Sequence, residues 1–358
     1  MTKLVTYGGR TLAAVLLLAL IATVAASTSR GASSAASVSP LFPPTAPSKA
    51  KWASVIAKAK KEGSVTIYSA QAPTSLADLA TAFKAKYGIE VKVNRQVDSV
   101  MVQQITAEQG SGKPVADLWV QASKNYTLGA VTNKWITAPI GPNFYAKGFN
   151  RKTLLGPGPT AIVAAAVLGM GWNTRLYPQG IKDIPDFLDP KLTGKIGVPQ
   201  PTSASFIDWY LWLEEIYGPT ILNKLAAQKP KIYLSSLTMM QAVISGEITA
   251  SPFVPGVALD QKKIGAPIDF KLANKGKAWN APFWGMILKN APHPNAAQLL
   301  DDFIVTKEGQ AAVQHYAGAV IPGAPDTIFV PPRVPNLKNF TPAKIAAFQA
   351  RWKALFQP

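Results

Sequence analysis

Apolar and polar positions along the first third of the chain switch between a helical and a strand period. Residues 51–61 carry apolar positions at helical spacing, and the β-branched run at residues 64–68 predicts a strand. The elements expected next are a helix at 75–87, a strand at 89–93, a helix at 100–110 and a strand at 117–120. Strands that alternate with helices predict an α/β fold on a mostly parallel sheet.

The same alternation returns in the second half of the chain. The expected elements are a strand at 195–198, helices at 205–217 and 239–245, a strand at 248–251 and a helix at 293–306. Two apolar segments, 161–172 and 278–287, join the halves, and two such crossings predict a hinge. Because residues 49–358 are too many for one compact core of usual size, we expect two lobes.

The amino-terminal segment has the pattern of a secretory signal peptide. Lys3 and Arg10 precede an apolar run that ends at Ala26, and the run is shorter than the about 20 residues that a membrane span needs. We therefore expect residues 1–26 to be a signal peptide, with an uncleaved anchor as the open alternative. Residues 27–48 are Ala, Ser, Thr and Pro with little else, which predicts a flexible linker.

The chain contains no cysteine. This excludes disulfides, thiolate metal ligands and a cysteine nucleophile, and it also removes the residue that lipidation would use. The mature protein is therefore expected to be periplasmic or secreted, either soluble or held by an uncleaved signal.

The formal charge is +18, and removal of Lys3 and Arg10 with the signal leaves +16. Such a surplus attracts anions. Apart from Lys58, Lys60 and Lys61, the basic residues are scattered, and no nucleic-acid-binding module is recognisable. We expect no nucleic-acid partner, and we interpret the charge as favouring solubility and, more weakly, an anionic ligand.

Several segments resemble one protein family, the bacterial extracellular solute-binding proteins of ATP-driven (ABC) importers. The most specific stretch is residues 287–297, Ile-Leu-Lys-Asn-Ala-Pro-His-Pro-Asn-Ala-Ala. The others are residues 63–70 (Gly-Ser-Val-Thr-Ile-Tyr-Ser-Ala), 116–120 (Ala-Asp-Leu-Trp-Val), 193–199 (Thr-Gly-Lys-Ile-Gly-Val-Pro) and 241–247 (Gln-Ala-Val-Ile-Ser-Gly-Glu). Together they are similar to the branch that includes ferric-iron, thiamine, polyamine and phosphonate receptors.

The resemblance implies the type 2 periplasmic binding protein fold and a monomer that delivers a small-molecule ligand to an ABC permease. It divides the chain into lobe 1 at residues 49–163 and 281–322, a hinge strand with lobe 2 at 164–280, and a carboxy-terminal tail at 323–358. It implies no enzyme activity and no cofactor. A ligand-sensing module without transport has the same fold and stays open.

Hydroxyl and amide side chains gather in three loops where strands end and helices begin. Helix N-termini present free N–H groups and partial positive charge, which suits phosphate, carboxylate or sulfonate groups. Each serine or threonine taken alone is equally an ordinary helix cap. That the loops face one cleft is what the resemblance implies. The expected ligand-binding residues are Ser69, Gln71 and Ser75, then Ser123 with its neighbour Asn125, and Thr202, Ser203 and Ser205.

Aromatic side chains are expected to complete the binding site. Trp279 and Trp284 lie near the second crossing, and aromatic rings wall small-molecule pockets. A tryptophan there could also stack on an organic cation, so amines stay open as ligands. Phe253 and Pro255 stand in the region where iron-binding members carry adjacent tyrosines, and we expect them to shape specificity.

A directly bound metal is not expected. Ferric iron needs phenolates and carboxylates, and residues 251–258 contain no tyrosine. An iron or iron-chelate receptor remains the alternative. His293 and His315 have no cluster of ligand-type neighbours and are interpreted as structural. The chain has no Gly-x-Ser-x-Gly elbow, so no catalytic residues are predicted.

The carboxy-terminal segment, residues 342–356, predicts a basic amphipathic helix. Ile345, Phe348, Trp352 and Leu355 share one face. We expect this face to pack on a lobe, with attachment to another surface as the alternative.

Overall fold

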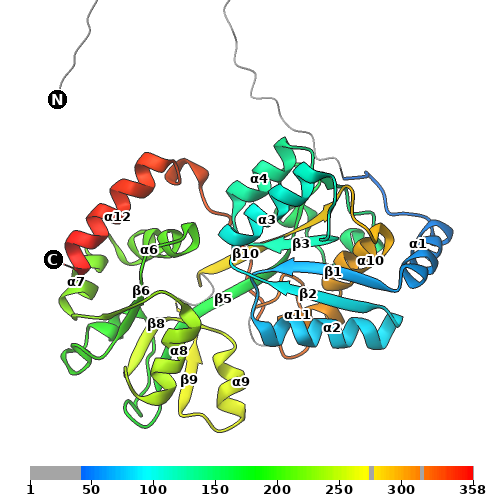
Figure 1. Cartoon of the computed structure of the whole chain (residues 1–358). Helices are drawn as coiled ribbons and strands as arrows, with labels where there is room; N and C mark the ends of the chain where they lie inside the picture. Colours follow the sequence, from blue (N-terminus) through cyan, green and yellow to red (C-terminus); the bar gives the residue numbers. More distant parts are fainter. Residues whose placement is uncertain (1–41, 274–277, 315–317, 358) are drawn as a thin grey trace, which may run out of the picture. The chain divides into compact units, whose positions relative to one another are not determined.

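The computed structural model of the protein describes residues 42–273, 278–314 and 318–357, which belong to one compact unit (Figure 1). The expected signal peptide, residues 27–41 of the expected linker, and His315 lie outside the described residues. The remainder of that linker is not flexible as expected, because Phe42 is buried in the core of lobe 1. Within the described ranges, no helix combines the length and apolar character that a membrane crossing requires.

Lobe 1 is built on parallel strands that alternate with helices, as the sequence predicts. Residues 64–69 pair in parallel with strands on both sides. The strands of this lobe are β1 (Ser64–Ser69), β2 (Glu90–Arg95), β3 (Leu118–Gln121) and β4 (Ile136–Thr137). Its helices are α1 (Lys49–Glu62), α2 (Pro73–Tyr87), α3 (Asp98–Ser111), α4 (Lys124–Thr132), α5 (Arg151–Leu154), α10 (Pro294–Ile304) and α11 (Lys307–Val313).

Lobe 2 contains a separate two-stranded parallel sheet and two further strands that join the main sheet. Its strands are β6 (Gly197–Pro199), β7 (Lys231–Tyr233), β8 (Ala250–Pro255) and β9 (Ile268–Lys271). Its helices are α6 (Ala204–Tyr217), α7 (Ile221–Ala227), α8 (Ser236–Ser245), α9 (Ala258–Lys263) and α12 (Pro342–Phe356).

Short 3-10 helices of the described chain lie at Pro142–Tyr145, Ile184–Leu188, Pro190–Leu192 and Leu337–Asn339.

The two predicted crossings are long buried strands, β5 (Ala161–Asn173) and β10 (Asn280–Leu288). Each contributes one end to each apolar core: Val163 and Ile287 pack in lobe 1, whereas Met170 and Ala281 pack in lobe 2. The two strands pair with each other in antiparallel fashion. They therefore form the two-strand hinge that the sequence predicts. The lobe boundaries themselves, such as 163/164 inside β5, stay predictions.

The expectation of a mostly parallel sheet is wrong. The order of the main sheet is β2-β1-β3-β10-β5-β8, with β4 paired to β10 and β9 to β5. Among the described strands, three pairings are parallel and five are antiparallel. The crossing strands cause this, because they run in opposite directions between the lobes and each pairs with local strands.

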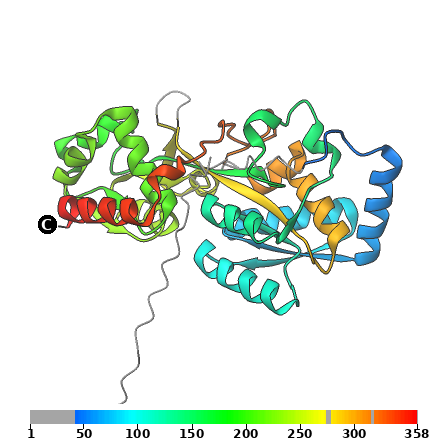
Figure 2. The same ribbon diagram turned by 90° about the horizontal axis from the view of Figure 1, so that it is seen from above.

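The carboxy-terminal tail makes a further passage between the lobes. Val320 and Ile321 pack in the core of lobe 1, and Val330 and Phe340 pack in the core of lobe 2. Helix α12 then packs on lobe 2 next to α6 and α7, visible as the red helix in Figures 1 and 2. The prediction that this helix packs on a lobe is confirmed.

A buried carboxylate links three elements of lobe 1. Asp117, fully buried beside β3, accepts hydrogen bonds from the backbone N–H of Thr66 (2.7 Å) and of His293 (2.6 Å). The Nδ1 atom of His293 lies 2.9 Å from the same carboxylate. His293 thus holds the start of α10 against the sheet, in line with its structural interpretation.

Candidate functional site

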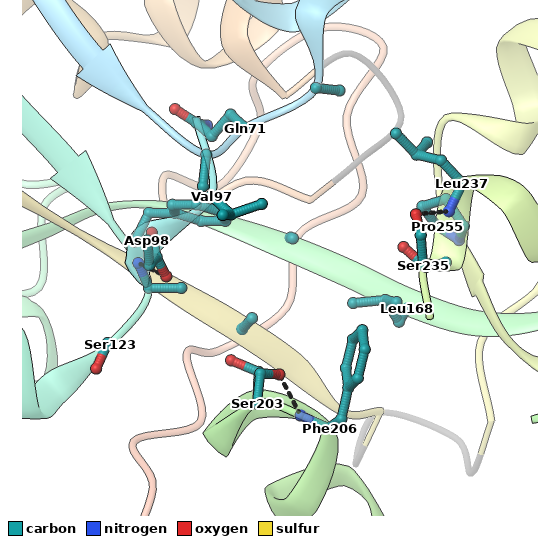
Figure 3. Close-up of a pocket in the computed structure, with 18 of the residues that line it drawn as sticks. Gln71, Val97, Asp98, Ser123, Leu168, Ser203, Phe206, Ser235, Leu237 and Pro255 are labelled. Carbon is teal, nitrogen blue, oxygen red and sulfur yellow. Dashed lines mark hydrogen bonds between the residues drawn. The ribbon is translucent and has the colours of Figure 1, made fainter. Parts of the chain in front are cut away.

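A cavity of about 700 Å³ is lined by residues from both lobes. Figure 3 shows Gln71, Val97 and Asp98 on the side of lobe 1, and Ser203 and Ser235 on the side of lobe 2. Most of the lining comes from segments in which a strand ends and a helix begins, which is where α/β sheets bind ligands.

Five helices of at least nine residues begin at the cavity. Their N-cap residues all line it: Ala72 of α2, Val97 of α3, Ser123 of α4, Ser203 of α6 and Ser235 of α8. Each helix N-terminus carries partial positive charge and N–H groups without an intrahelical partner. Five of them around one cavity make it attractive for a negatively charged group.

The caps differ between the helices. The Oγ atoms of Ser203 and Ser235 each accept a first-turn N–H at 3.2 Å, and that of Ser123 accepts one at 3.5 Å. Each hydroxyl keeps its own O–H as a donor. Ala72 and Val97 cannot cap, so the first turns of α2 and α3 receive no side-chain cap. Both arrangements leave donors that a ligand can use.

Nine of the eleven residues expected from the sequence lie in the lining of this one cavity. They are Gln71, Ser75, Ser123, Thr202, Ser203, Ser205, Phe253, Pro255 and Trp279. Asn125 lies there as well. Their contact with a ligand stays a prediction.

Ser69 and Trp284 lie elsewhere. Ser69 is fully buried, and its hydroxyl donates to Gln71 Oε1 and accepts from the Gln71 N–H, both at 3.2 Å, so it orients Gln71. Trp284 is buried in the core of lobe 1. Alternate residues of a strand face opposite sides, and on β10 the cavity side carries Ala281 and Phe283. Trp284 therefore points away from the cavity, and its neighbour Phe283 lines the cavity instead.

Sequence reasoning missed several lining residues. Ser235 and Ser236 precede an apolar helical run, the same capping signal that identified Ser203, but the helix was expected to begin three residues later, at 239. Arg95 ends β2 and its Nε donates to the backbone oxygen of Gln71 at 3.3 Å. An arginine at a strand end is too common in sequences to have marked it.

Three described residues of the lining have titratable side chains, Arg95, Asp98 and Tyr126. Asp98 is the one that carries a carboxylate. Its Oδ2 accepts the N–H of Ala122 at 3.3 Å, whereas Oδ1 is buried without a hydrogen-bond partner. Burial raises the pKa of Asp98 to about 6, against the opposing effect of that hydrogen bond. The cavity therefore loses a negative charge under mildly acidic conditions.

Aromatic rings form the apolar wall of the cavity. Phe253 lies between Phe206 and Trp279, with ring centroids 5.2 Å and 5.7 Å apart. Trp279 is fixed from behind because its Nε1 donates to Asp208 Oδ2 at 2.8 Å. Apolar walls with a few placed polar groups are typical of sites for small organic molecules.

A profile for the bacterial extracellular solute-binding proteins matches residues 65–317, most of the chain. The chain belongs to this family. Its members are extracytoplasmic receptors of the ABC-importer type. The cavity lined by both lobes is the candidate solute site of this solute-binding protein.

Solved structures support the fold assignment. The solute-binding protein superposes on iron-bound HitA from Pseudomonas aeruginosa with a TM-score of 0.59 and 20% identity, covering 82% of this chain and 98% of that one. AfuA from Actinobacillus pleuropneumoniae, solved with fructose-6-phosphate, gives 0.61 and 20%, covering 82% and 99%. A substrate-binding protein of an ABC transporter from Agrobacterium tumefaciens gives 0.64 and 15%, covering 82% and 96%. At these identities the likeness shows the two-lobed type 2 fold.

Proposed function

We propose that this solute-binding protein captures a small organic anion between its lobes and delivers it to an ABC permease. The observation that carries the proposal is the convergence of five helix N-termini on one cavity. The anionic group would bind near Ser123, Ser203 and Ser235, and the organic part would contact Phe253 and Trp279. The proposed ligand thus combines one negative group with a compact apolar or polar body.

Closure of the lobes would follow from the position of the cavity. A ligand that contacts Gln71 and Ser75 of lobe 1 and Thr202 and Ser203 of lobe 2 favours the conformation in which both sets reach it. The ligand-bound conformation would then be the one that the permease recognises. The protein would act as a periplasmic or secreted monomer with no nucleic-acid partner.

The chemistry of the lining supports binding rather than catalysis or direct iron coordination. The described lining contains no histidine to act as a base for its hydroxyl groups. Within the described residues, no group of three or more His, Asp or Glu could hold a metal ion. Asp98 and Tyr126 alone offer too few hard ligands for ferric iron. An iron chelate with anionic groups belongs in the ligand panel, and a sensing role would use the same cavity.

A thermal-shift panel tests the proposed ligand class. The chain from Ser27 onward is mixed with phosphonates, sulfonates, carboxylates, polyamines, thiamine, ferric salts and ferric citrate. A ligand at 100 times its dissociation constant should add about 2.7 kcal/mol to the free energy of unfolding, and this raises the melting temperature. We expect an organic anion to give the largest rise. Stabilisation by amines or ferric salts alone would contradict the proposal.

The charge on Asp98 provides a second test. Ionised Asp98 repels an anion, so the affinity for ethanesulfonate, whose own charge is constant in this range, should fall as pH rises through about 6. Asp98→Asn is neutral at every pH, and it should bind about tenfold more tightly than the wild type at pH 8 and equally at pH 5. Calorimetric titration measures both. A cationic ligand such as putrescine would reverse both signs.

A further inference from the structure

The carboxy-terminal helix α12 reaches the candidate cavity, although it lies beyond residues 65–317, which carry the family match. Ile345, in the first turn of α12, is part of the cavity lining. It is partly buried against the core of lobe 2. An apolar side chain from outside the matched region thus contributes to the wall of the site.

The same helix holds the loop that carries Thr202 and Ser203. Gln349 Nε2 donates to the backbone oxygen of Pro201 at 2.9 Å. A second hydrogen bond runs from the Tyr210 hydroxyl of α6 to the backbone oxygen of Pro199 at 2.6 Å. Both ends of the short segment that leads to the α6 N-terminus are therefore tied, one of them directly by α12.

Tyr210 is in turn packed by α12. Its ring lies 6.0 Å, 6.1 Å and 5.9 Å from the rings of Phe348, Trp352 and Phe356. Because all four rings are buried, this contact fixes where the Tyr210 hydroxyl lies. Arg351 adds a bidentate pair with Glu214 of α6, with distances of 2.9 Å and 2.8 Å.

The segment that leads to α12 is also tied to the wall of the cavity. Asn280 of β10 donates to the backbone oxygen of Pro331 and accepts the N–H of Arg333, both at 3.0 Å. The Arg333 Nε lies 3.2 Å from Asp208 Oδ2, the atom that also accepts from Trp279. Side-chain contacts therefore connect the tail, through Arg333 and Asp208, to Trp279 of the aromatic wall.

From these contacts we infer that α12 is a specificity element of the ligand site. Ile345 limits the space for the organic part of the ligand, and Gln349 positions the Thr202–Ser203 loop that meets the anionic group. This inference rests on the proposed function of the cavity. It assigns to residues outside the matched region a role in choosing the ligand, beyond covering the core of lobe 2.

Dissociation constants of the full mature chain for methylphosphonate, butylphosphonate and phenylphosphonate test the role of Ile345. Ile345→Ala enlarges the cavity and should shift the preference toward the two larger probes by about fivefold, whereas Ile345→Phe should shift it about as far toward methylphosphonate. Lys353→Ala, on the exposed side of the same helix, should leave the order of affinities unchanged. Identical preferences in all four proteins would overturn the role of Ile345.

Gln349→Leu tests the positioning role. It removes the hydrogen bond to Pro201 and should weaken all three probes by about tenfold without changing their order. A readout without ligand accompanies it: amide hydrogen exchange in residues 202–206 should become faster in Gln349→Leu and stay unchanged in Lys353→Ala. Unchanged exchange and affinity would overturn the inference.

The two proposals fail in different ways. If the wild type binds none of the probes, the proposed function fails for this ligand class, and the exchange experiment still decides whether Gln349 positions the loop. If the wild type binds and every α12 variant binds with the same affinity and preference, the proposed function stands and the role of α12 is wrong. If Ile345→Ala or Ile345→Phe without ligand melts at a lower temperature than the wild type, the substitution disturbs the fold. The more conservative Ile345→Val is then used in its place, and its probe preference should shift in the same direction as in Ile345→Ala, but by less.

Discussion

Asp301→Asn should stabilise the protein, and the gain should grow as pH rises from 5 to 8. Asp301 lies on α10, is 1% exposed, and neither of its carboxyl oxygens has a hydrogen-bond partner in the described part of the chain. Its Oδ1 packs against Gly285 of β10, where even an added Cβ would come within 2.5 Å. Burial, and then the charge of Asp302, raise the pKa of Asp301 to about 8.

The direction of the effect follows from proton linkage. The unfolded carboxyl group loses its proton near pH 3.9 (about the reference value), and the folded one does so near pH 8. Between these values the folded state binds more protons, so the free energy of unfolding falls as pH rises. Relative to a pH below 3.9, a shift of this size corresponds to a loss on the order of 5 kcal/mol in the free energy of unfolding at pH 8, and most of this loss falls between pH 5 and pH 8. Asn cannot ionise, so the variant escapes this loss.

Asp302→Asn is the matched control at the neighbouring position. Asp302 accepts hydrogen bonds from the backbone N–H and the side-chain amide of Asn143, at 2.8 Å and 2.7 Å. An amide at 302 can accept only part of these, so this variant should lose about 1–3 kcal/mol at pH 5. Burial also raises the pKa of Asp302, to about 6, so this loss should shrink as pH rises toward 8, by less than the gain in Asp301→Asn grows. Urea titrations at pH 5, 6.5 and 8 measure both variants. If wild type and Asp301→Asn lose stability in parallel with pH, Asp301 does not keep its proton in the folded state.

Much of the fold is encoded locally and could be predicted from the sequence. The helix expected at 75–87 is α2, Pro73–Tyr87, and glycine at position 88 ends it with a positive φ, as glycine does after many helices. Strand direction was not available in the same way. All but one of the thirteen residues of β5 are buried, so its sequence shows no period of two, and nothing local indicates that its neighbours run antiparallel.

The candidate site, like the fold, could be predicted only where the signal in the sequence is local. Serines before apolar helical runs mark helix N-termini, and this local signal led to Ser123 and Ser203. Asp98 carries an equally local signal, an acid in the first turn of a helix, which indicates only a favourable interaction with the helix dipole. Burial raises its pKa, and its carboxylate accepts the N–H of Ala122, a contact between segments distant in the chain. Such contacts are absent from any local pattern.

The role of α12 lay beyond sequence reasoning for a similar reason. Its apolar face predicted packing on a lobe, and the structure places Phe348 and Trp352 in the core of lobe 2. That Ile345 from the same face lines the cavity depends on where the α6 N-terminus lies relative to the tail. Two elements more than a hundred residues apart in the chain determine this contact together.

Ser203→Asp should abolish binding of an anionic ligand while leaving the fold intact. Ser203 is the exposed N-cap of α6 and lines the cavity. Asp is as good an N-cap as Ser, so the melting temperature without ligand should not change. The new carboxylate would stand about 4 Å from the bound anion, where repulsion amounts to about 4 kcal/mol at an effective dielectric constant of about 20. Salt screening reduces this, and we expect affinity to fall by at least about 100-fold.

Ser48→Asp supplies the same change of charge and helix position away from the site. Ser48 caps α1, its Oγ accepting the Lys51 N–H at 3.2 Å, and it lies outside the cavity lining. Calorimetric titration with the most stabilising anion of the panel compares both variants with the wild type. Loss of binding in Ser203→Asp alone places the anion at the start of α6. Tighter binding of an amine to Ser203→Asp would instead contradict the proposal. It would show that serine side chains alone satisfy the helix N-termini and that the cavity selects a cation through its aromatic wall.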